Sequence, residues 1–406
     1  GILGVMSSYN DYDGFPIQSS YYWLTQRLRG TMGFRGYVVS DSDAVEYLYS
    51  KHKTAKDMKE AVRQSVEAGL NVRCTFRSPE SYVLPLRELI QEGGLSMETI
   101  DNRVRDILRV KFLTGLFDTP YQTDLALADK EVNSEAHQQV ALQASREGLV
   151  LLKNANNLLP LDKSQIKRIA VCGPNADEAS FALTHYGPVA VEVTTVLEGI
   201  RQQVKEGTKV TYTKGCDLVD ANWPESEIIS YPLTAEEKTE IQKAVDNVKE
   251  SDVAVVVLGG GIRTCGENKS RTSLDLPGHQ QQLLEAIAAT GKPVVLVLIN
   301  GRPLSINWAD KFVPAILEAW YPGEQGAQAI CEILFGEVNP SAKLPITFPR
   351  SVGQLPLFYA MKPSGRGYGY VENDGSPLYP FGYGLSYTTF HLNNFSCEEK
   401  NGGLSV

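Results

Sequence analysis

The sequence predicts an α/β protein with more than one domain. Residues 1–117 read as the C-terminal part of a (β/α)8 barrel, residues 146–350 as an α/β sandwich, and residues 386–406 as the start of a β-sandwich. Three observations support this prediction. Short apolar runs alternate with helical spacing in both long segments, the runs of the second segment are continuously apolar, and the last segment opens with strand-like alternation.

The first segment contains three strand candidates separated by helix candidates. The apolar runs at 2–9, 37–42 and 70–74 predict the strands, and apolar spacing of 3 and 4 predicts helices at 18–30, 56–69, 82–90 and 97–115. Alternation with short connections predicts parallel strands joined by right-handed crossovers.

Three strands fit either a small open sheet or part of a barrel. A barrel needs eight strands, so five would have to lie before Gly1. The chain starts at Gly1 without a Met and enters an apolar stretch at once, so we expect it to be a fragment. That expectation favours the barrel.

Residues 118–145 are expected to form a polar linker and a helix, which lead into the second alternating segment. The helix leads into an apolar run at 149–154. The strand candidates of the segment are 168–173, 209–215, 253–259, 293–300, 315–320 and 344–348, and the helix candidates are 235–250, 278–290 and 324–335. Continuous Val, Ile and Leu runs are typical of strands covered on both faces. Residues 351–385, rich in Gly, Pro and Tyr, are expected to be an irregular connector.

Composition excludes several classes of protein. The chain has 406 residues, with 39 Lys and Arg against 48 Asp and Glu, which gives a net charge of −9. This acidic balance argues against a general nucleic-acid surface, and no apolar run approaches the ~20 residues of a membrane span. The six Cys and five His show no metal-ligand spacing, so we expect no zinc site.

Polar side chains end all three strand candidates of the first segment. Tyr9, Asp41 and Arg73 follow the successive apolar runs, and the carboxyl ends of parallel strands are where catalytic groups collect. A plainer explanation is that Asp41 and Asp43 only form a turn, because Ser-Asp-Ser-Asp is good turn chemistry. Three polar endings at one edge favour a functional site.

A second candidate lies in the Gly-rich loop 259–278, which follows the run at 253–259. It fits no phosphate-binding pattern, because Gly266 is followed by Glu267 where a P-loop needs Lys. The loop could instead present Glu267 at a cleft, although a single loop Glu is usually just solvated. A Gly-x-Ser-x-Gly motif, which would indicate a serine hydrolase, is absent from the sequence.

Many motifs along the chain, in this order, resemble those of glycoside hydrolase family 3. The resemblance covers almost the whole chain and rests on MSSYN (6–10), the run from Asn10 to Val45 with its Val-Ser-Asp strand end, ASREGLVLLKNANNLLPL (144–161), CGPNAD (172–177), GENKSRTSLDLPGHQ (266–280), LINGRPL (298–304), WYPGEQG (320–326), GEVNPSAKLPITFP (336–349) and YPFGYGLSYTTF (379–390).

The resemblance implies roles for individual residues. It implies that Asp41 is the catalytic nucleophile and Glu267 the general acid/base, carried in from the second domain. It places Tyr9 near the nucleophile and the last segment at the start of a fibronectin-III-like domain. Retaining glycosidases need such a pair of carboxyls, one ionised and one protonated. We also expect Arg73 and Arg271 to bind substrate, and Arg271 to fix the loop while pointing away from Glu267.

Ser42 bears on the sugar that is bound. Many β-glucosidases of the family have Trp directly after the nucleophile, whereas Ser-Asp-x-Asp-[AS]-Val resembles the xylosidase-like branch. The resemblance therefore implies an exo-acting retaining β-glycosidase, with β-xylosidase favoured over β-glucosidase. Its substrate would be an oligosaccharide or glycoside, and its location periplasmic or extracellular. A relative that binds carbohydrate without catalysis is the alternative of another class, and we expect the 406-residue chain alone to be inactive.

Overall fold

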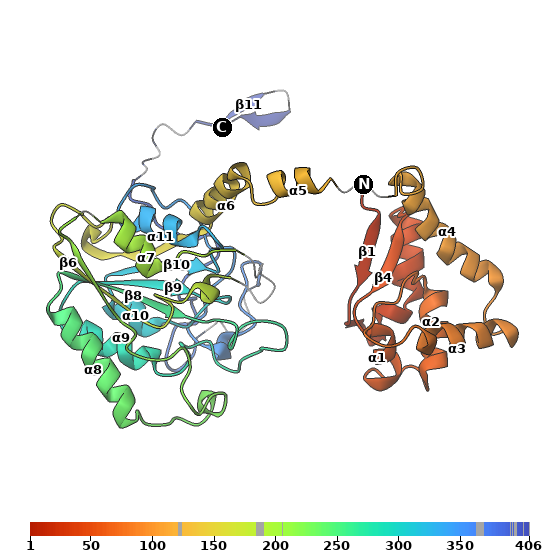
Figure 1. Cartoon of the computed structure of the whole chain (residues 1–406), viewed down its shortest axis with the longest axis horizontal. Coiled ribbons are helices and arrows are strands. Elements are labelled where there is room, and N and C mark those ends of the chain that lie inside the picture. The colour runs from red at the N-terminus through yellow and green to blue at the C-terminus, as the bar shows by residue number, and fades with distance from the viewer. Residues whose placement is uncertain are drawn as a thin grey trace. The chain divides into compact units, whose positions relative to one another are not determined.

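The computed structural model describes residues 1–120, 124–183, 191–204, 206–362, 369–389, 391, 393, 396–400 and 402–405. The chain forms two compact units, Gly1–Asp129 and Lys130–Val406 (Figure 1). Among the described residues, no helix has the length and apolar character needed to cross a membrane.

The first unit is built on two parallel strands. β1 (Gly4–Ser7) pairs with β4 (Tyr37–Ser40), with Ser7 opposite Ser40 at their carboxyl ends. Between them lie a small hairpin, β2 (Asp11–Tyr12) and β3 (Phe15–Pro16), and two helical segments, η1 (Ile17–Ser19) and η2 (Tyr22–Thr31). The expected helix at 18–30 is thus divided, and η2 ends with the Met32 amide bonded to the Arg27 carbonyl, five residues back.

Helices follow the strands of this unit. They are α1 (Ala44–Ser50), α2 (Met58–Ala68), α3 (Glu80–Gln91), α4 (Met97–Leu113) and α5 (Leu125–Glu131), the last of which crosses the boundary between the units. Side-chain caps start α2 and α4, where Asp57 and Ser96 accept backbone amides of their first turns. Helix α5 lies in the segment expected to be a linker, and α1 was not expected at all.

The third expected strand, at 70–74, is wrong. Only Val72 forms a bridge, to Val39 of β4, and the chain then leaves the ladder. Asn71 consequently lies beside the start of β4, where its side-chain oxygen accepts the Val38 amide at 2.8 Å and an Arg29 nitrogen at 2.7 Å. Asn71 therefore supports the sheet and is not at the carboxyl edge.

The second unit contains a six-stranded sheet with the order β5-β10-β9-β8-β6-β7. The strands are β5 (Val150–Asn154), β6 (Arg168–Cys172), β7 (Lys209–Thr213), β8 (Val253–Gly259), β9 (Val294–Ile299) and β10 (Ala315–Trp320). All neighbours are parallel except β5, which is antiparallel to β10. The sequence predicted five of these strands, whereas β5 lies in the apolar run 149–154, for which no strand was expected.

Helices cover both faces of this sheet (Figure 1). Alternate residues of β8 point to opposite faces, so Ala254, Val256 and Leu258 join one apolar core and Val253, Val255 and Val257 join the other. The first core includes α8 (Ala235–Lys249), α9 (Gln280–Ala288) and α10 (Asn307–Phe312), and the second includes α6 (Glu135–Gly148), α7 (Val196–Gln203) and α11 (Gly326–Leu334). Covering on both faces is why these strands are continuously apolar.

Two further segments are less regular. The strand expected at 344–348 is wrong, since Phe348 forms a single bridge to Tyr379 and Pro345 has no amide hydrogen to extend a ladder. The short helical turns η3 (Ala155–Asn157), η4 (Ala179–Ala182), η5 (Glu225–Glu227) and η6 (Val352–Gln354) lie in connections. Near the C-terminus, β11 (Glu398–Lys400) and β12 (Gly403–Ser405) form an antiparallel pair, while residues 390, 392, 394, 395, 401 and 406 of the expected β-sandwich lie outside the described residues.

Candidate active site

Asp41 and Tyr9 lie at the same edge of the parallel pair in the first unit. Asp41 directly follows β4 and Tyr9 lies two residues after β1, whose last residue is opposite Ser40. The Asp41 carboxylate accepts the amide of Ser42 at 2.7 Å, and the Tyr9 hydroxyl donates to the Ser42 carbonyl at 2.9 Å. Ser42 therefore links the two side chains that the sequence placed at this edge.

The Asp41 turn is tied to the loop that follows residue 72. The Ser40 hydroxyl accepts the Cys74 amide at 2.8 Å and donates to the Asp41 carbonyl at 2.9 Å. The Asp43 amide donates to the Cys74 carbonyl at 3.0 Å, and the Ser42 hydroxyl lies 3.7 Å from the Cys74 sulfur. These bonds fix the Asp41 turn and the loop at Cys74 relative to each other and to the end of β4.

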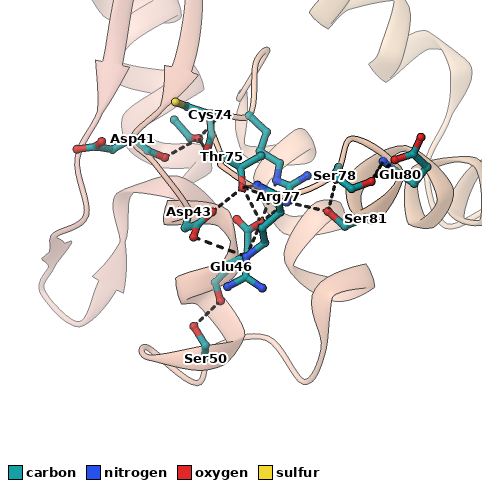
Figure 2. A network of polar contacts seen from close by, with 12 residues as sticks. Asp41, Asp43, Glu46, Ser50, Cys74, Thr75, Arg77, Ser78, Glu80 and Ser81 are labelled. Carbon is teal, nitrogen blue, oxygen red and sulfur yellow. Dashed lines mark hydrogen bonds and ion pairs between the residues drawn. The ribbon is translucent and has the colours of Figure 1, made fainter.

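A network of charged side chains lies beside this turn (Figure 2). Asp43 has a left-handed backbone with φ of 57° and begins helix α1. Its carboxylate accepts the Thr75 hydroxyl and lies 3.6 Å from the Arg77 guanidinium. In Figure 2 the carboxylate of Asp41 points away from this network, so the network supports the backbone of the turn and leaves the Asp41 carboxylate aside.

Arg73 belongs to the same network. Its guanidinium is bound to the carboxylate of Glu46 on α1, and the two side chains are only 4% and 1% exposed. Arg73 also donates to the Ser81 hydroxyl at 2.9 Å and lies over the ring of Tyr82. The structure thus brings Arg73 close to the turn but engages its charge with Glu46, and its contact with substrate stays a prediction.

The sequence reasoning missed Glu46, Thr75 and Arg77. Glu46 lies on the unexpected helix α1, three residues after the αL residue Asp43, with the buried Val45 and Leu48 beside it. Such a Glu between apolar neighbours needs a partner if it is to be buried. Arg73, which the sequence analysis had already placed at the end of a strand candidate, was the residue that could have indicated this partner.

In the second unit, Glu267 lies in the loop after β8. It is exposed, and its neighbours Gly266 and Asn268 both have positive φ, 141° and 59°. The Lys269 amide closes a turn around it by donating to the Gly266 carbonyl at 3.2 Å. The loop therefore presents Glu267 at the tip of a tight turn.

Arg271 anchors the following part of this loop. It makes two contacts of 2.5 Å with the carboxylate of Glu227, donates to the Asp275 carbonyl at 3.0 Å, and lies over the Trp223 ring. Arg271 and Glu227 are 5% and 12% exposed. This geometry fits the expected loop-fixing role, while contact of Arg271 with substrate stays a prediction.

The geometry allows acid–base and nucleophilic chemistry by carboxylates. Within the described part of the chain, no cluster of three or more His, Cys, Asp or Glu side chains could hold a metal ion. The fold and these strand-end loops define an α/β protein whose polar groups gather where parallel strands end.

Comparison with known families identifies which α/β family this is. The glycosyl hydrolase family 3 N-terminal domain matches residues 1–110, and the glycosyl hydrolase family 3 C-terminal domain matches residues 149–387. The chain belongs to glycosyl hydrolase family 3.

Curated proteins and solved structures agree with this assignment. The chain is 38% identical to a β-xylosidase of Formosa agariphila, over 96% of this chain and 54% of that protein. It is 39% identical to a periplasmic β-glucosidase of Salmonella typhimurium, over 97% and 54%. A β-glucosidase structure from Erythrobacter marinus matches with a TM-score of 0.86 at 39% identity, over 95% and 52%. The chain thus spans about half the length of these relatives.

Proposed function

We propose that the protein is an exo-acting retaining β-glycosidase that releases single sugars from the non-reducing ends of oligosaccharides or glycosides. The observation that carries the proposal is the position of Asp41 and Glu267. Asp41 directly follows the parallel strand β4, and Glu267 lies in the loop that follows the parallel strand β8, each inside one of the two family matches. The hydrolases among the matched relatives support the same class.

The proposed mechanism has two displacements. The ionised Asp41 attacks the anomeric carbon while Glu267 gives its proton to the leaving oxygen, which breaks the glycosidic bond and leaves a glycosyl ester on Asp41. Glu267, now a carboxylate, then takes a proton from water, and the resulting hydroxide breaks the ester. Neither step requires a metal or an organic cofactor.

The sugar is proposed to be β-xylose, with β-glucose as the alternative. Ser42 puts a small side chain directly after the nucleophile, where many β-glucosidases of the family have Trp. Its hydroxyl lies 3.7 Å from the Cys74 sulfur. The relatives support both sugars, since one is a β-xylosidase and one a β-glucosidase.

Three structural and cellular features belong to the same proposal. Residues 1–117 are proposed to complete a (β/α)8 barrel together with strands from the rest of a longer protein, and residues 386–406 to open a fibronectin-III-like domain. A periplasmic or extracellular location is proposed from the periplasmic β-glucosidase among the relatives.

The test is hydrolysis of aryl β-xylosides and aryl β-glucosides by the full-length protein and its Asp41→Asn variant. We expect activity on at least one sugar, a higher kcat/KM for the xyloside, and a loss of at least about 10³-fold in the variant, because a nucleophile is removed. Activity that is indifferent to Asp41 would exclude the proposed role. No activity on either sugar would favour the carbohydrate-binding alternative.

A further inference from the structure

The turn that presents Glu267 needs contacts with residues outside it to keep its backbone conformation. Residues 264–269 contain two positions with positive φ, at Gly266 and Asn268, and positive φ is strained for a residue with a side chain such as Asn268. Backbone conformations of this kind persist only where their surroundings hold them. The following inference rests on the proposed role of Glu267 as the acid/base.

Arg302, from the turn after β9, provides such support. One of its guanidinium nitrogens donates to the Thr264 carbonyl at 2.8 Å and to the Lys269 carbonyl at 3.0 Å. These carbonyls lie three residues before and two residues after Glu267. A single side chain therefore binds main-chain carbonyls on both sides of Glu267.

The same turn after β9 packs directly under the loop. A Cβ atom on Gly301 would lie 2.5 Å from the Cys265 sulfur and 2.6 Å from the Tyr321 ring, distances that real Cβ atoms do not show. The Cys265 thiol is also 3.9 Å from the Gly301 carbonyl. Cys265 of the loop thus packs against Gly301 with no room for a side chain at that position.

The backbone of Arg302 is held by the buried side chain of Asn300. Its amide donates to the side-chain oxygen of Asn300 at 3.2 Å, and the side-chain nitrogen of Asn300 donates to both carboxyl oxygens of Glu318 at 3.1 and 3.2 Å. The Glu318 side chain is fully buried, and Asn300 is 1% exposed. The buried Asn300–Glu318 pair, next to the ends of β9 and β10, therefore fixes the position of the Arg302 backbone.

We propose that Arg302 is a positioning residue for Glu267. It does not touch the substrate. Its guanidinium holds the Thr264 and Lys269 carbonyls, and its backbone is fixed by the Asn300–Glu318 pair. Arg302 thereby keeps the Glu267 carboxyl where it can protonate the leaving oxygen. A displacement of about 1 Å at a reacting group can lower a rate by about 10²-fold.

The test uses substrates that differ only in their need for the proton. In the full-length protein, Arg302→Met keeps the apolar stem and removes both hydrogen bonds. We expect kcat/KM to fall about 10–100-fold for a methyl glycoside, whose alkoxide leaves poorly, and less than about 3-fold for the 2,4-dinitrophenyl glycoside, which leaves without a proton. Arg302→Lys, which can still donate to a carbonyl, is expected to recover part of the loss.

Two reference variants distinguish a failure of the Arg302 proposal from a failure of the acid/base role proposed for Glu267. Glu267→Gln should show the same leaving-group pattern more strongly, and Arg263→Met, an exposed Arg of the same loop, should behave like the unmodified protein. Equal losses on both substrates in Arg302→Met would overturn the positioning role. A flat pattern in Glu267→Gln would overturn the acid/base assignment, and the inference with it.

Hydrogen exchange tests the same claim without activity. Arg302→Met should speed exchange of the Cys265 and Lys269 amides, which are bonded to the Gly261 and Gly266 carbonyls, by about 10-fold or more. The amides of β9 should stay protected, which shows that the variant is folded. Unchanged exchange at Cys265 and Lys269 would contradict the inference.

Discussion

Glu46 and Arg73 form an ion pair that is almost completely removed from solvent beneath the turn that carries Asp41. Arg73 contributes its Nε and a terminal nitrogen to the same carboxyl oxygen of Glu46, and the second oxygen has no hydrogen-bond partner among the described residues. Charges buried in this way are tolerated only as a pair. The pair joins α1 to the loop after residue 72, so the shape of the Asp41 turn depends on it.

Removal of one partner of this pair should be strongly destabilising. We expect Glu46→Gln to lower the free energy of unfolding by about 3–5 kcal/mol, because it leaves the Arg73 charge buried without its counter-charge. Urea unfolding of the full-length protein measures this. The control is Glu67→Gln, which breaks an exposed pair with Arg63 and should lower stability by less than about 0.5 kcal/mol. Equal effects of the two substitutions would show that burial of the Glu46–Arg73 pair has no energetic consequence.

Glu318 should make the second unit less stable as the pH rises. Burial raises the pKa of this carboxyl to about 8, against the opposing hydrogen bonds from the Trp320 amide and Asn300. The folded state therefore binds more protons than the unfolded state between about pH 4.5 and pH 8, and stability falls with rising pH across that window. Below pH 4.5 the carboxyl is protonated in both states, and its stabilising contribution is complete.

Denaturant unfolding at several pH values checks this expectation. We expect the free energy of unfolding to decrease from pH 5 to pH 7.5, with a slope of at most about 1.4 kcal/mol per pH unit from one proton. Glu318→Gln cannot ionise and should remove this part of the slope. Identical slopes in the two proteins would mean that Glu318 does not titrate in this range.

The ion pair between Arg271 and Glu227 should hold the loop that carries Glu267 in place. Glu227→Gln leaves the guanidinium of Arg271 with a neutral partner, so we expect the loop 259–278 to open more often and trypsin to cut after Lys269 at least about 5-fold faster. The matched control is Glu225→Gln, two residues away, where an exposed carboxylate accepts the Tyr231 hydroxyl at 2.9 Å. If the two variants are cut at the same rate, the ion pair does not restrain the loop.

The sequence predicted the parts of the molecule that depend on local pattern. Five strands of the large sheet, all except β5, were predicted from their apolar runs, which are continuous and buried in β8 and β9, where both faces are covered. Tyr9 and Asp41 were placed at one edge because parallel strands put their carboxyl ends together. These inferences need only the periodicity and direction of the strands.

Other features depend on contacts between distant residues and could not be predicted. Residues 70–74 and 344–348 are apolar enough for strands, yet each makes one bridge, because Arg73 turns toward Glu46 and Pro345 interrupts pairing. The link from Arg302 to the Glu267 turn joins residues 33 to 38 positions apart and uses main-chain carbonyls. No sequence motif records a hydrogen bond to a main-chain carbonyl.

The central claim, that Asp41 is the nucleophile, is tested most directly by trapping its covalent intermediate. A 2,4-dinitrophenyl 2-deoxy-2-fluoro-β-glycoside of xylose or glucose should react once with the full-length protein and release one dinitrophenolate. Because the fluorine slows the second displacement, the sugar should stay bound as an ester. The account predicts, by mass spectrometry of a proteolytic digest, a fluorosugar on Asp41 and none in the Asp41→Asn variant. A label on another carboxylate, or release of dinitrophenolate without any label, would contradict it.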